Sequence, residues 1–102
     1  MEIEYSSTFK RDLKRLKRKH YPVHLITACI EAIVDRDAIK LRIIKDHALS
    51  GKWSKYREFH PARINNTSGK QFDQWIVVYC IDNDRIVLTL IATGNHDILK
   101  SI

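Results

Sequence analysis

Two apolar segments near the C-terminus decide the fold: WIVVYCI at residues 75–81 and RIVLTLIA at residues 85–92. Both are apolar at nearly every position, which is typical of strands that are covered on both faces. Between them lies Asp82-Asn83-Asp84, three residues that favour turns. The pattern therefore predicts a β-hairpin at the centre of a covered sheet.

A third strand is indicated upstream of this hairpin by WSKYREFH at residues 53–60. It follows the turn signal Ser50-Gly51 and ends at Pro61, because proline cannot donate a ladder hydrogen bond. A period of two places Tyr56, Glu58 and His60 on one face, and Trp53, Lys55, Arg57 and Phe59 on the other. The polar sequence NNTSG at residues 65–69 then predicts a loop.

The N-terminal third predicts a short strand followed by a basic helix. EIEY at residues 2–5 alternates as a strand does, and the Ser6-Ser7-Thr8 cluster supplies hydroxyls for a helix N-cap. Phe9, Leu13 and Leu16 then recur at helical spacing. They predict a helix that runs to about His20.

A second helix is predicted from Pro22, which suits a first helical turn, to about Asp35. The two helices would form a hairpin across Tyr21-Pro22. From Leu41 to Gly51 the pattern is irregular and indicates no regular element. The apolar face of the second helix contains Leu25, Ile26, Cys29, Ile30, Ile33 and Val34.

These elements predict an α+β fold. Their order is β-α-α-β-β-β plus a short C-terminal segment, in which an N-terminal strand and a two-helix hairpin pack on a small antiparallel sheet. The chain has 102 residues, enough for one domain spanning residues 1–102, and no internal repeat or linker divides it.

Composition argues against a membrane protein. No stretch approaches the roughly 18 consecutive apolar residues of a membrane helix, and the N-terminus MEIEYSSTFK lacks the basic and then apolar pattern of a secretory signal. We therefore expect a cytoplasmic protein. Cys29 and Cys80 lie in apolar runs, where we expect free thiols.

The charge distribution indicates an acidic partner. The net charge is +6, and residues 10–20, KRDLKRLKRKH, contain seven of the 18 Lys and Arg residues. Such a stripe attracts a phosphate backbone, although a solvated helix face is the alternative interpretation. The candidate RNA-binding residues of this stripe are Lys10, Arg11, Lys14, Arg15, Lys17 and Arg18. Three further candidates near the third strand are Lys52, Arg57 and Arg63.

Three histidines fall at the edges of the predicted elements, where sites are usually built: His47, His60 and His96. Any one of them alone would be interpreted as a local cap or packing residue. Together with Glu58 and Asp73 they suit RNA cleavage without metal, which needs a base, an acid and nearby cations. His20 and His24, in the helical hairpin, are expected at the surface.

A zinc site is the competing chemical interpretation of these histidines. Their separations of 13 and 36 residues match no compact ligand motif, and the chain has no CxxC pair. We therefore expect neither a metal nor another cofactor. Phosphate-cradling loops and a G-x-S-x-G nucleophile motif are also absent from the sequence.

Four segments also carry a family resemblance: KDHALSGKW at residues 45–53, YREFH at 56–60, WIVVY at 75–79 and TGNHDIL at 93–99. In this order they resemble the signature segments of YafQ-type toxins in the RelE superfamily, and the basic helix at residues 9–18 is similar too. The likeness spans almost the whole chain.

The resemblance implies a RelE-like fold and the toxin of a type II toxin-antitoxin system. Its activity would be that of an mRNA interferase: a ribosome-dependent, metal-independent endoribonuclease that inhibits translation by cleaving mRNA through attack of a ribose 2′-OH. His47, His60 and His96 would be catalytic, with Glu58 and Asp73 beside them; His96 is our choice for the acid and His47 for the base. The implied partners are a cognate antitoxin and the ribosome, whose 16S rRNA the basic helix would contact.

Two positions depart from the family pattern. Gln74 rather than an aspartate precedes Trp75, so Asp73 would point to the other face unless a bulge intervenes. Lys100 stands where an aromatic residue often follows the last histidine. Two other functions stay open: a non-enzymatic inhibitor of DNA gyrase on the same scaffold, and a basic nucleic-acid-binding module.

Overall fold

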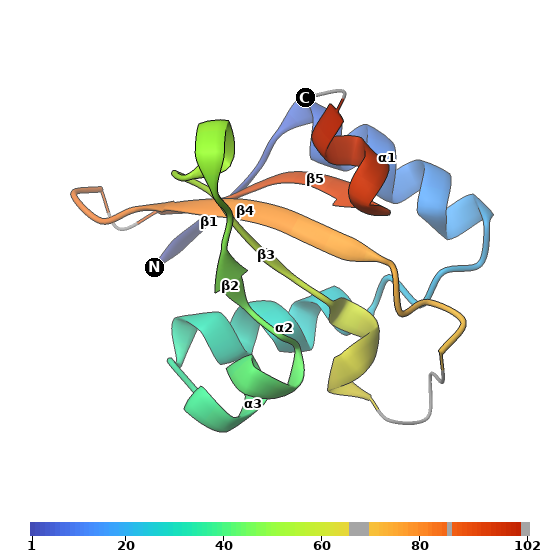
Figure 1. Cartoon of the computed structure of the whole chain (residues 1–102), viewed down its shortest axis with the longest axis horizontal. Helices are drawn as coiled ribbons and strands as arrows, with labels where there is room; N and C mark the ends of the chain where they lie inside the picture. Colours follow the sequence, from blue (N-terminus) through green and yellow to red (C-terminus); the bar gives the residue numbers. More distant parts are fainter. Residues whose placement is uncertain (66–69, 86, 101–102) are drawn as a thin grey trace.

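The predicted hairpin forms the middle of the sheet (Figure 1). The computed structural model describes residues 1–65, 70–85 and 87–100. Within this part, β4 (Ile76–Asp82) and β5 (Val87–Gly94) lie at the centre of a five-stranded sheet with the order β1-β5-β4-β3-β2. The prediction of a central hairpin is therefore confirmed.

The sheet is mixed, because β1 (Glu2–Tyr5) runs parallel to β5. All other neighbours, including β3 (Arg57–Phe59) and β2 (His47–Ala48), are antiparallel. The α+β class is confirmed. The sheet differs from the expected one in its parallel edge and in the short strand β2, which lies in the segment that we took as irregular. No hairpin joins β1 to β5, so no tight turn fixes their relative direction.

The basic helix forms as predicted. α1 (Ser7–Arg18) is capped by Ser6, whose Oγ accepts a hydrogen bond from the Phe9 N–H at 2.9 Å and donates one to the Ile91 carbonyl at 2.6 Å. The helix ends slightly before the expected His20, which takes a positive φ of 64°. One hydroxyl thus fixes both the start of α1 and its place beside β5.

The second helical region differs from the prediction in two ways. α2 (Leu25–Val34) begins after Pro22, which lies in a turn closed by a Leu25 N–H to Pro22 carbonyl bond of 3.0 Å. A further short helix, α3 (Ala38–Ile43), occupies part of the segment that we took as irregular. At six residues it is too short for a helical period to be recognised in the sequence, and none of its residues is fully buried.

The strand predicted over residues 53–60 is shorter in the structure. Only Arg57–Phe59 forms β3, and Gly51–Trp53 forms a 3₁₀ turn, η1. The Trp53 ring packs edge-on against Tyr56 at 5.4 Å, which folds this aromatic run back on itself. A second 3₁₀ turn, η2 (Pro61–Ile64), follows; residues 66–69 of the predicted loop lie outside the described residues.

One hydrophobic core joins the helices to one face of the sheet. α1 packs mainly on β5, and α2 packs on α3 and η2, so the helices cover different parts of that face (Figure 1). Because side chains alternate along a strand, Phe59 on β3 faces this core while Glu58 and His60 face the other side. The cluster consists of Phe9, Leu16, Ile26, Cys29, Ile33, Ile44, Phe59, Ala62, Trp75, Val77, Tyr79, Leu88 and Leu90.

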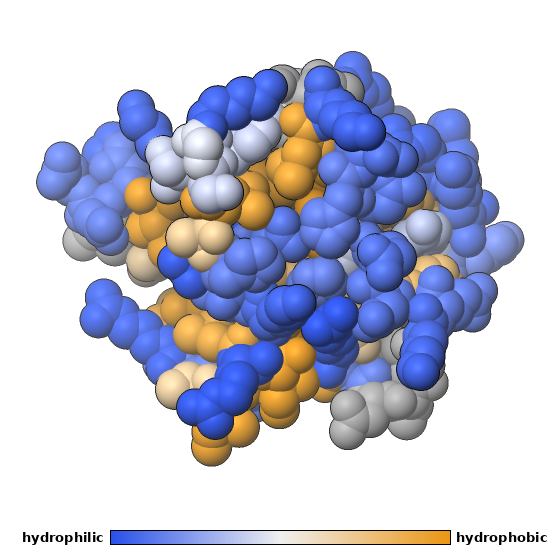
Figure 2. Space-filling view, viewed as in Figure 1, coloured by the Kyte–Doolittle hydropathy of each residue, from blue (hydrophilic) through white to orange (hydrophobic). Residues whose placement is uncertain are grey.

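The surface in the same view is mostly hydrophilic (Figure 2). Apolar side chains gather at its lower edge, where Figure 1 places α3, and this helix carries the exposed Ile39 and Ile43. In the described ranges, no helix is long and apolar enough to cross a membrane. Cys29 and Cys80 are both free, as predicted, and burial raises the pKa of the Cys29 thiol to about 12.

The buried hydrogen bond between Trp75 Nε1–H and Thr93 Oγ1 (2.8 Å) provides a test of the fold. Thr93→Val should lower the free energy of unfolding by about 1–3 kcal/mol, because it leaves the indole N–H without its partner. Urea unfolding measures this change. Thr89→Val, at a half-buried position of the same strand, is the control, and an equal loss in both variants would contradict the prediction.

Candidate active site

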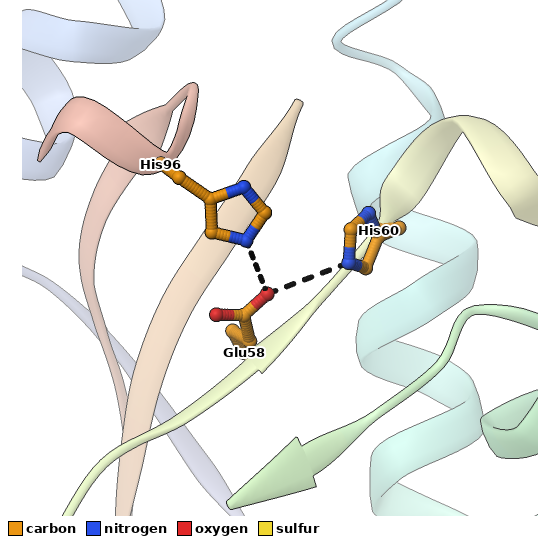
Figure 3. A group of neighbouring side chains, drawn as sticks. All are labelled: Glu58, His60 and His96. Carbon is orange, nitrogen blue, oxygen red and sulfur yellow. Dashed lines mark hydrogen bonds and ion pairs between the residues drawn. The ribbon is translucent and has the colours of Figure 1, made fainter. Parts of the chain in front are cut away.

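Three histidines meet at one buried carboxylate. The side chain of Glu58 is 2 % exposed, and its Oε2 lies 3.0 Å from His96 Nε2, 3.4 Å from His60 Nε2 and 3.8 Å from His47 Nε2. Figure 3 shows the rings of His60 and His96 turned toward this oxygen from opposite sides. The structure therefore brings together four of the five residues predicted to be catalytic.

Each histidine comes from a different element. His47 lies on β2 directly opposite Glu58 in the strand register. His60 follows Glu58 by two residues at the end of β3 and so shares its face, as the sequence pattern predicted. His96 begins η4 (His96–Lys100), the turn after β5. The group thus depends on the pairing of β2 with β3 and on the position of η4.

Backbone carbonyls orient two of the rings. His47 Nδ1 lies 2.7 Å from the Lys45 carbonyl, and His60 Nδ1 lies 3.1 Å from the Asp73 carbonyl. A carbonyl oxygen only accepts hydrogen bonds, so both Nδ1 atoms carry a proton. The Nε2 atoms of His47 and His60 therefore face the site, and each can take or give a proton there.

Glu58 is held as a carboxylate by these neighbours. Burial raises its pKa, but hydrogen bonds from His60 and His96 and the charges of His96 and His47 outweigh burial and place the pKa below its usual value.

The η4 turn is held against the end of β5 by close packing. A Cβ at Gly94 would lie 2.6 Å from Ile98 Cγ2, so only glycine fits where η4 folds back. One residue earlier, the Thr93 N–H donates to the buried carboxylate of Asp12 on α1 at 3.2 Å. These contacts fix the segment that carries His96.

Asp73 does not join the histidines through its carboxylate. That group forms a two-point ion pair with Arg63, at 3.0 and 3.3 Å, and only the Asp73 carbonyl reaches His60. Its neighbour Gln74 lines a pocket of about 250 Å³ together with Asn95, His96 and Asp97. Of the two residues before Trp75, Gln74 is therefore the one beside the site, and the predicted catalytic role of the Asp73 side chain has no geometric support.

Arg57 points away from the site, as strand alternation predicted. It forms an ion pair with Asp46 at 2.7 Å, and the Tyr79 hydroxyl donates to the same carboxylate. The hydrogen bond to Asp46 raises the pKa of Arg57. The pKa of the Tyr79 hydroxyl is raised too, first by burial and then by its hydrogen bond to Asp46. Arg57 and Arg63 are thus both paired with carboxylates, and their predicted contact with RNA stays a prediction.

Among the basic residues of α1, Arg15 approaches the end of β5, which precedes His96. Its Nη2 is 3.6 Å from the Cβ position at Gly94, two residues before His96, and its Nη1 pairs with Asp12 at 3.3 Å. The other predicted basic residues of α1 are exposed, as is Lys52, whose ammonium lies 5.7 Å from the Trp53 ring. His20 and His24 are exposed, as predicted.

Three residues that support this region were not predicted from the sequence: Asp12, Asp46 and Thr93. Asp12 sits inside a basic helix, where nothing in the sequence distinguishes it from a surface charge. Asp46 and Thr93 lie within the family segments, but nothing in their spacing reveals which partner they meet. Their roles come from contacts between residues far apart in the chain.

The comparisons with known proteins agree with this geometry. The profile of a family described as the bacterial YafQ toxin of type II toxin-antitoxin systems matches residues 1–101. The chain belongs to the YafQ toxin family. This confirms the resemblance found in the four sequence segments and in the basic helix.

Individual YafQ relatives are distant in sequence. The mRNA interferase toxin YafQ of Escherichia coli K12 is 24% identical over 95 residues, which cover 93% of this chain and 90% of the relative. A chain in the crystal structure of the E. coli DinJ-YafQ toxin-antitoxin complex superposes with a TM-score of 0.71 at 24% identity, covering 96% of this chain and 94% of that one.

A structure described as a metal-bound toxin from Helicobacter pylori also superposes, with a TM-score of 0.70 and 24% identity. It covers 97% of this chain and 98% of that chain. At such identities the superpositions establish the fold, and the RelE-like arrangement is the one predicted from the sequence.

The lowered pKa of Glu58 makes stability depend on pH in a defined direction. A carboxyl whose folded pKa is depressed stabilises the fold above its unfolded pKa, about 4.3 for glutamate, and this contribution is lost as the pH falls through the folded pKa. Urea unfolding should therefore show that Glu58→Gln costs more stability at pH 6 than at pH 3. Exposed Glu31→Gln is the control; a pH-independent cost for Glu58→Gln would contradict this assignment.

Proposed function

We propose that this YafQ-family chain is an mRNA interferase, an endoribonuclease toxin that cuts mRNA on the ribosome without a metal ion. The observation that carries the proposal is the convergence of His47, His60 and His96 on the buried Glu58 carboxylate. It supplies several proton-transfer groups at one point on the surface, which is what 2′-OH cleavage of RNA requires.

In the proposed reaction, the ribose 2′ oxygen forms a bond to phosphorus while the bond from phosphorus to the 5′ oxygen breaks. His47 Nε2 accepts the 2′-OH proton, and protonated His96 donates a proton to the departing 5′ oxygen. The products are a 2′,3′-cyclic phosphate and a 5′-hydroxyl end. No metal or other cofactor takes part in these steps.

The role of His96 follows from its contact with Glu58. Its Nε2 lies 3.0 Å from the carboxylate oxygen, and the ring is half exposed beside the pocket that Gln74 lines. A carboxylate that holds one ring nitrogen fixes the orientation of the ring, as the aspartate of a serine-protease triad does. Nδ1 of His96 is then the atom that exchanges protons with RNA. His60, held by the Asp73 carbonyl, stabilises the same carboxylate and the phosphate.

The cation for the phosphate is supplied by α1 in this proposal. Arg15 of α1 lies beside Gly94, two residues before His96. Its pair with Asp12 fixes its direction without neutralising the helix, which keeps exposed basic residues on both sides. The rest of the helix would hold ribosomal RNA through its phosphates, a contact that salt weakens.

The partner that silences the toxin is proposed to be a cognate antitoxin. α1 borders a pocket of about 500 Å³ with an apolar floor and a basic rim, which suits an acidic amphipathic segment. Such a segment would cover the surface that otherwise meets ribosomal RNA, and the toxin would act in the cytoplasm, where translated mRNA is found. The pocket is lined by Lys10, Arg11, Leu13, Lys14, Lys17 and Val23.

Induced expression of the wild type should arrest growth and create new 5′-hydroxyl ends in translated messages. His96→Ala should lower cleavage by about a hundredfold or more, since it removes the general acid. His24→Ala, at an exposed histidine away from the site, should cleave as the wild type does. Growth arrest with intact messages would instead favour the gyrase inhibitor.

Arg15→Gln should reduce the rate of ribosome-dependent cleavage about tenfold or more, because it removes a cation beside the reacting phosphate. Arg11→Gln on the same helix removes the same charge farther from His96 and should have a smaller effect. Toeprinting on purified ribosomes measures both rates, with circular dichroism as a check of folding. Equal losses of cleavage rate in the two variants would mean that Arg15 contributes only to the overall charge of the helix.

A further inference from the structure

Of the three histidines in the site, His47 is held least closely by the shared carboxylate. Its Nε2 lies 3.8 Å from the Glu58 oxygen, farther than the Nε2 of either other histidine, and its side chain is 42% exposed. Its strand, β2, has only two residues, so the ladder of backbone hydrogen bonds around it is short. The contact with Glu58 alone therefore does not fix the His47 ring.

Asp46, the residue before His47, is anchored on the core face of the sheet. Its side chain is 7% exposed, and its Oδ2 accepts hydrogen bonds from Nη2 and Nε of Arg57 at 2.7 and 3.2 Å. The other oxygen, Oδ1, accepts a hydrogen bond from the Tyr79 hydroxyl. Arg57 on β3 is directly opposite Tyr79 on β4 in the strand register. Two neighbouring strands therefore hold the residue that leads into β2.

This anchor lies directly behind the pair formed by His47 and Glu58. His47 is opposite Glu58 in the register of β2 and β3, and Ala48 is opposite Arg57. Asp46 and Arg57 each come one residue before a member of the pair. Because successive side chains of a strand point to opposite faces, their ion pair crosses diagonally on the core face. It therefore fixes the position of His47 relative to Glu58 on the site face.

The turn that leads into β2 orients the ring itself. Lys45 takes a positive φ of 55° at the end of α3, which strains any residue other than glycine unless its surroundings hold it. Its N–H donates to the Arg42 carbonyl at 3.1 Å, and the Asp46 N–H donates to the Leu41 carbonyl at 3.0 Å, as in a Schellman cap. The Lys45 carbonyl accepts the His47 Nδ1–H at 2.7 Å. The position of this turn thus determines which ring nitrogen carries the proton.

We propose that Asp46 is a positioning residue for His47. Its carboxylate, fixed by β3 and β4, keeps the turn at Lys45 in the arrangement that points His47 Nε2 toward Glu58. The consequence for catalysis rests on the proposed function, in which this Nε2 accepts the 2′-OH proton. A base must lie within hydrogen-bond reach of the proton that it takes, so a displaced His47 ring slows cleavage without weakening the binding of RNA.

NMR of the His47 ring tests the positioning without any substrate. At about pH 8, where an ordinary imidazole is mostly neutral, proton–nitrogen correlation spectra distinguish a proton on Nδ1 from one on Nε2. We expect the Nδ1–H form in the wild type and a mixture of both forms in Asp46→Asn, whose amide offers Arg57 and Tyr79 one acceptor oxygen in place of two. Asp73→Asn, which removes a carboxylate from a similar two-point arginine pair, is the control and should leave the His47 ring unchanged.

A second variant removes the anchor without leaving a buried hydroxyl unpaired. Asp46→Ala combined with Tyr79→Phe takes away the acceptor and the donor together, a change that costs less stability than removing one of them. Arg57 is 41% exposed and can reach water. We expect the His47 ring to be released here too, with thermal unfolding as the check of folding. A ring that keeps its Nδ1–H form in both Asp46 variants would overturn the proposal, and Asp46→Asn alone decides if the double variant does not fold.

Single-turnover cleavage of mRNA on ribosomes measures the consequence for catalysis. In Asp46→Asn the rate at saturating toxin should fall about tenfold or more, while the toxin concentration that gives half the maximal rate stays within about twofold of the wild-type value. A smaller folded fraction would instead lower the amplitude of the reaction and leave its rate unchanged. An unchanged rate with a released His47 ring would overturn the effect on cleavage.

The two kinds of measurement separate this proposal from the proposed function. If the wild type cleaves no RNA, the proposed function fails, whereas the NMR spectra still decide whether Asp46 positions His47. If the wild type cleaves RNA and the His47 ring is the same in every variant, the proposed function stands and the positioning role of Asp46 is overturned.

Discussion

The arrangement of this site depends on one buried negative charge. Glu58 occupies the face of β3 turned away from the hydrophobic core, and its side chain is almost without solvent contact. A carboxylate in that position is costly unless positive or hydrogen-bonding groups surround it. Three histidines from three elements meet this need, so the short β2 strand, the end of β3 and the η4 turn are all tied to the same atom. The charge of Glu58 therefore organises the candidate site.

The two faces of the sheet have different roles. One face packs α1 and α2 into a single core, in which Trp75 and Tyr79 are among the largest buried side chains. The other face presents Glu58 and His60, at alternate positions of the strand that carries Phe59 into the core. The core behind the sheet holds the Nε2 atoms of His96, His60 and His47 at 3.0, 3.4 and 3.8 Å from one carboxylate oxygen. Groups that are already in place need little rearrangement to act on a substrate.

Much of the site was predictable because strand periodicity is a local property. A period of two placed Glu58 with His60 and placed Arg57 on the other face, and the structure has this arrangement. The family segments indicated that His47 and His96 belong with them. Asp73 was placed with the catalytic residues, yet its carboxylate meets Arg63 while its backbone supports His60. Side chains in an irregular segment have no period, so the direction of Asp73 and Gln74 depended on packing.

By itself, the sequence determined the central hairpin, the capped basic helix, the α+β class and the toxin family, because these rest on hydrophobic period, turn chemistry and ordered motifs. Only the tertiary structure decided that β1 joins β5 in parallel, that Asp12 and Asp46 serve as internal anchors, and that Arg15 lies beside the His96 segment. Separations of 13 and 36 residues match no ligand motif along the chain, but strand pairing and the fold of η4 bring His47, His60 and His96 around one carboxylate oxygen. Separation along the chain therefore does not predict which residues meet, because the pairing of distant strands brings the site residues together.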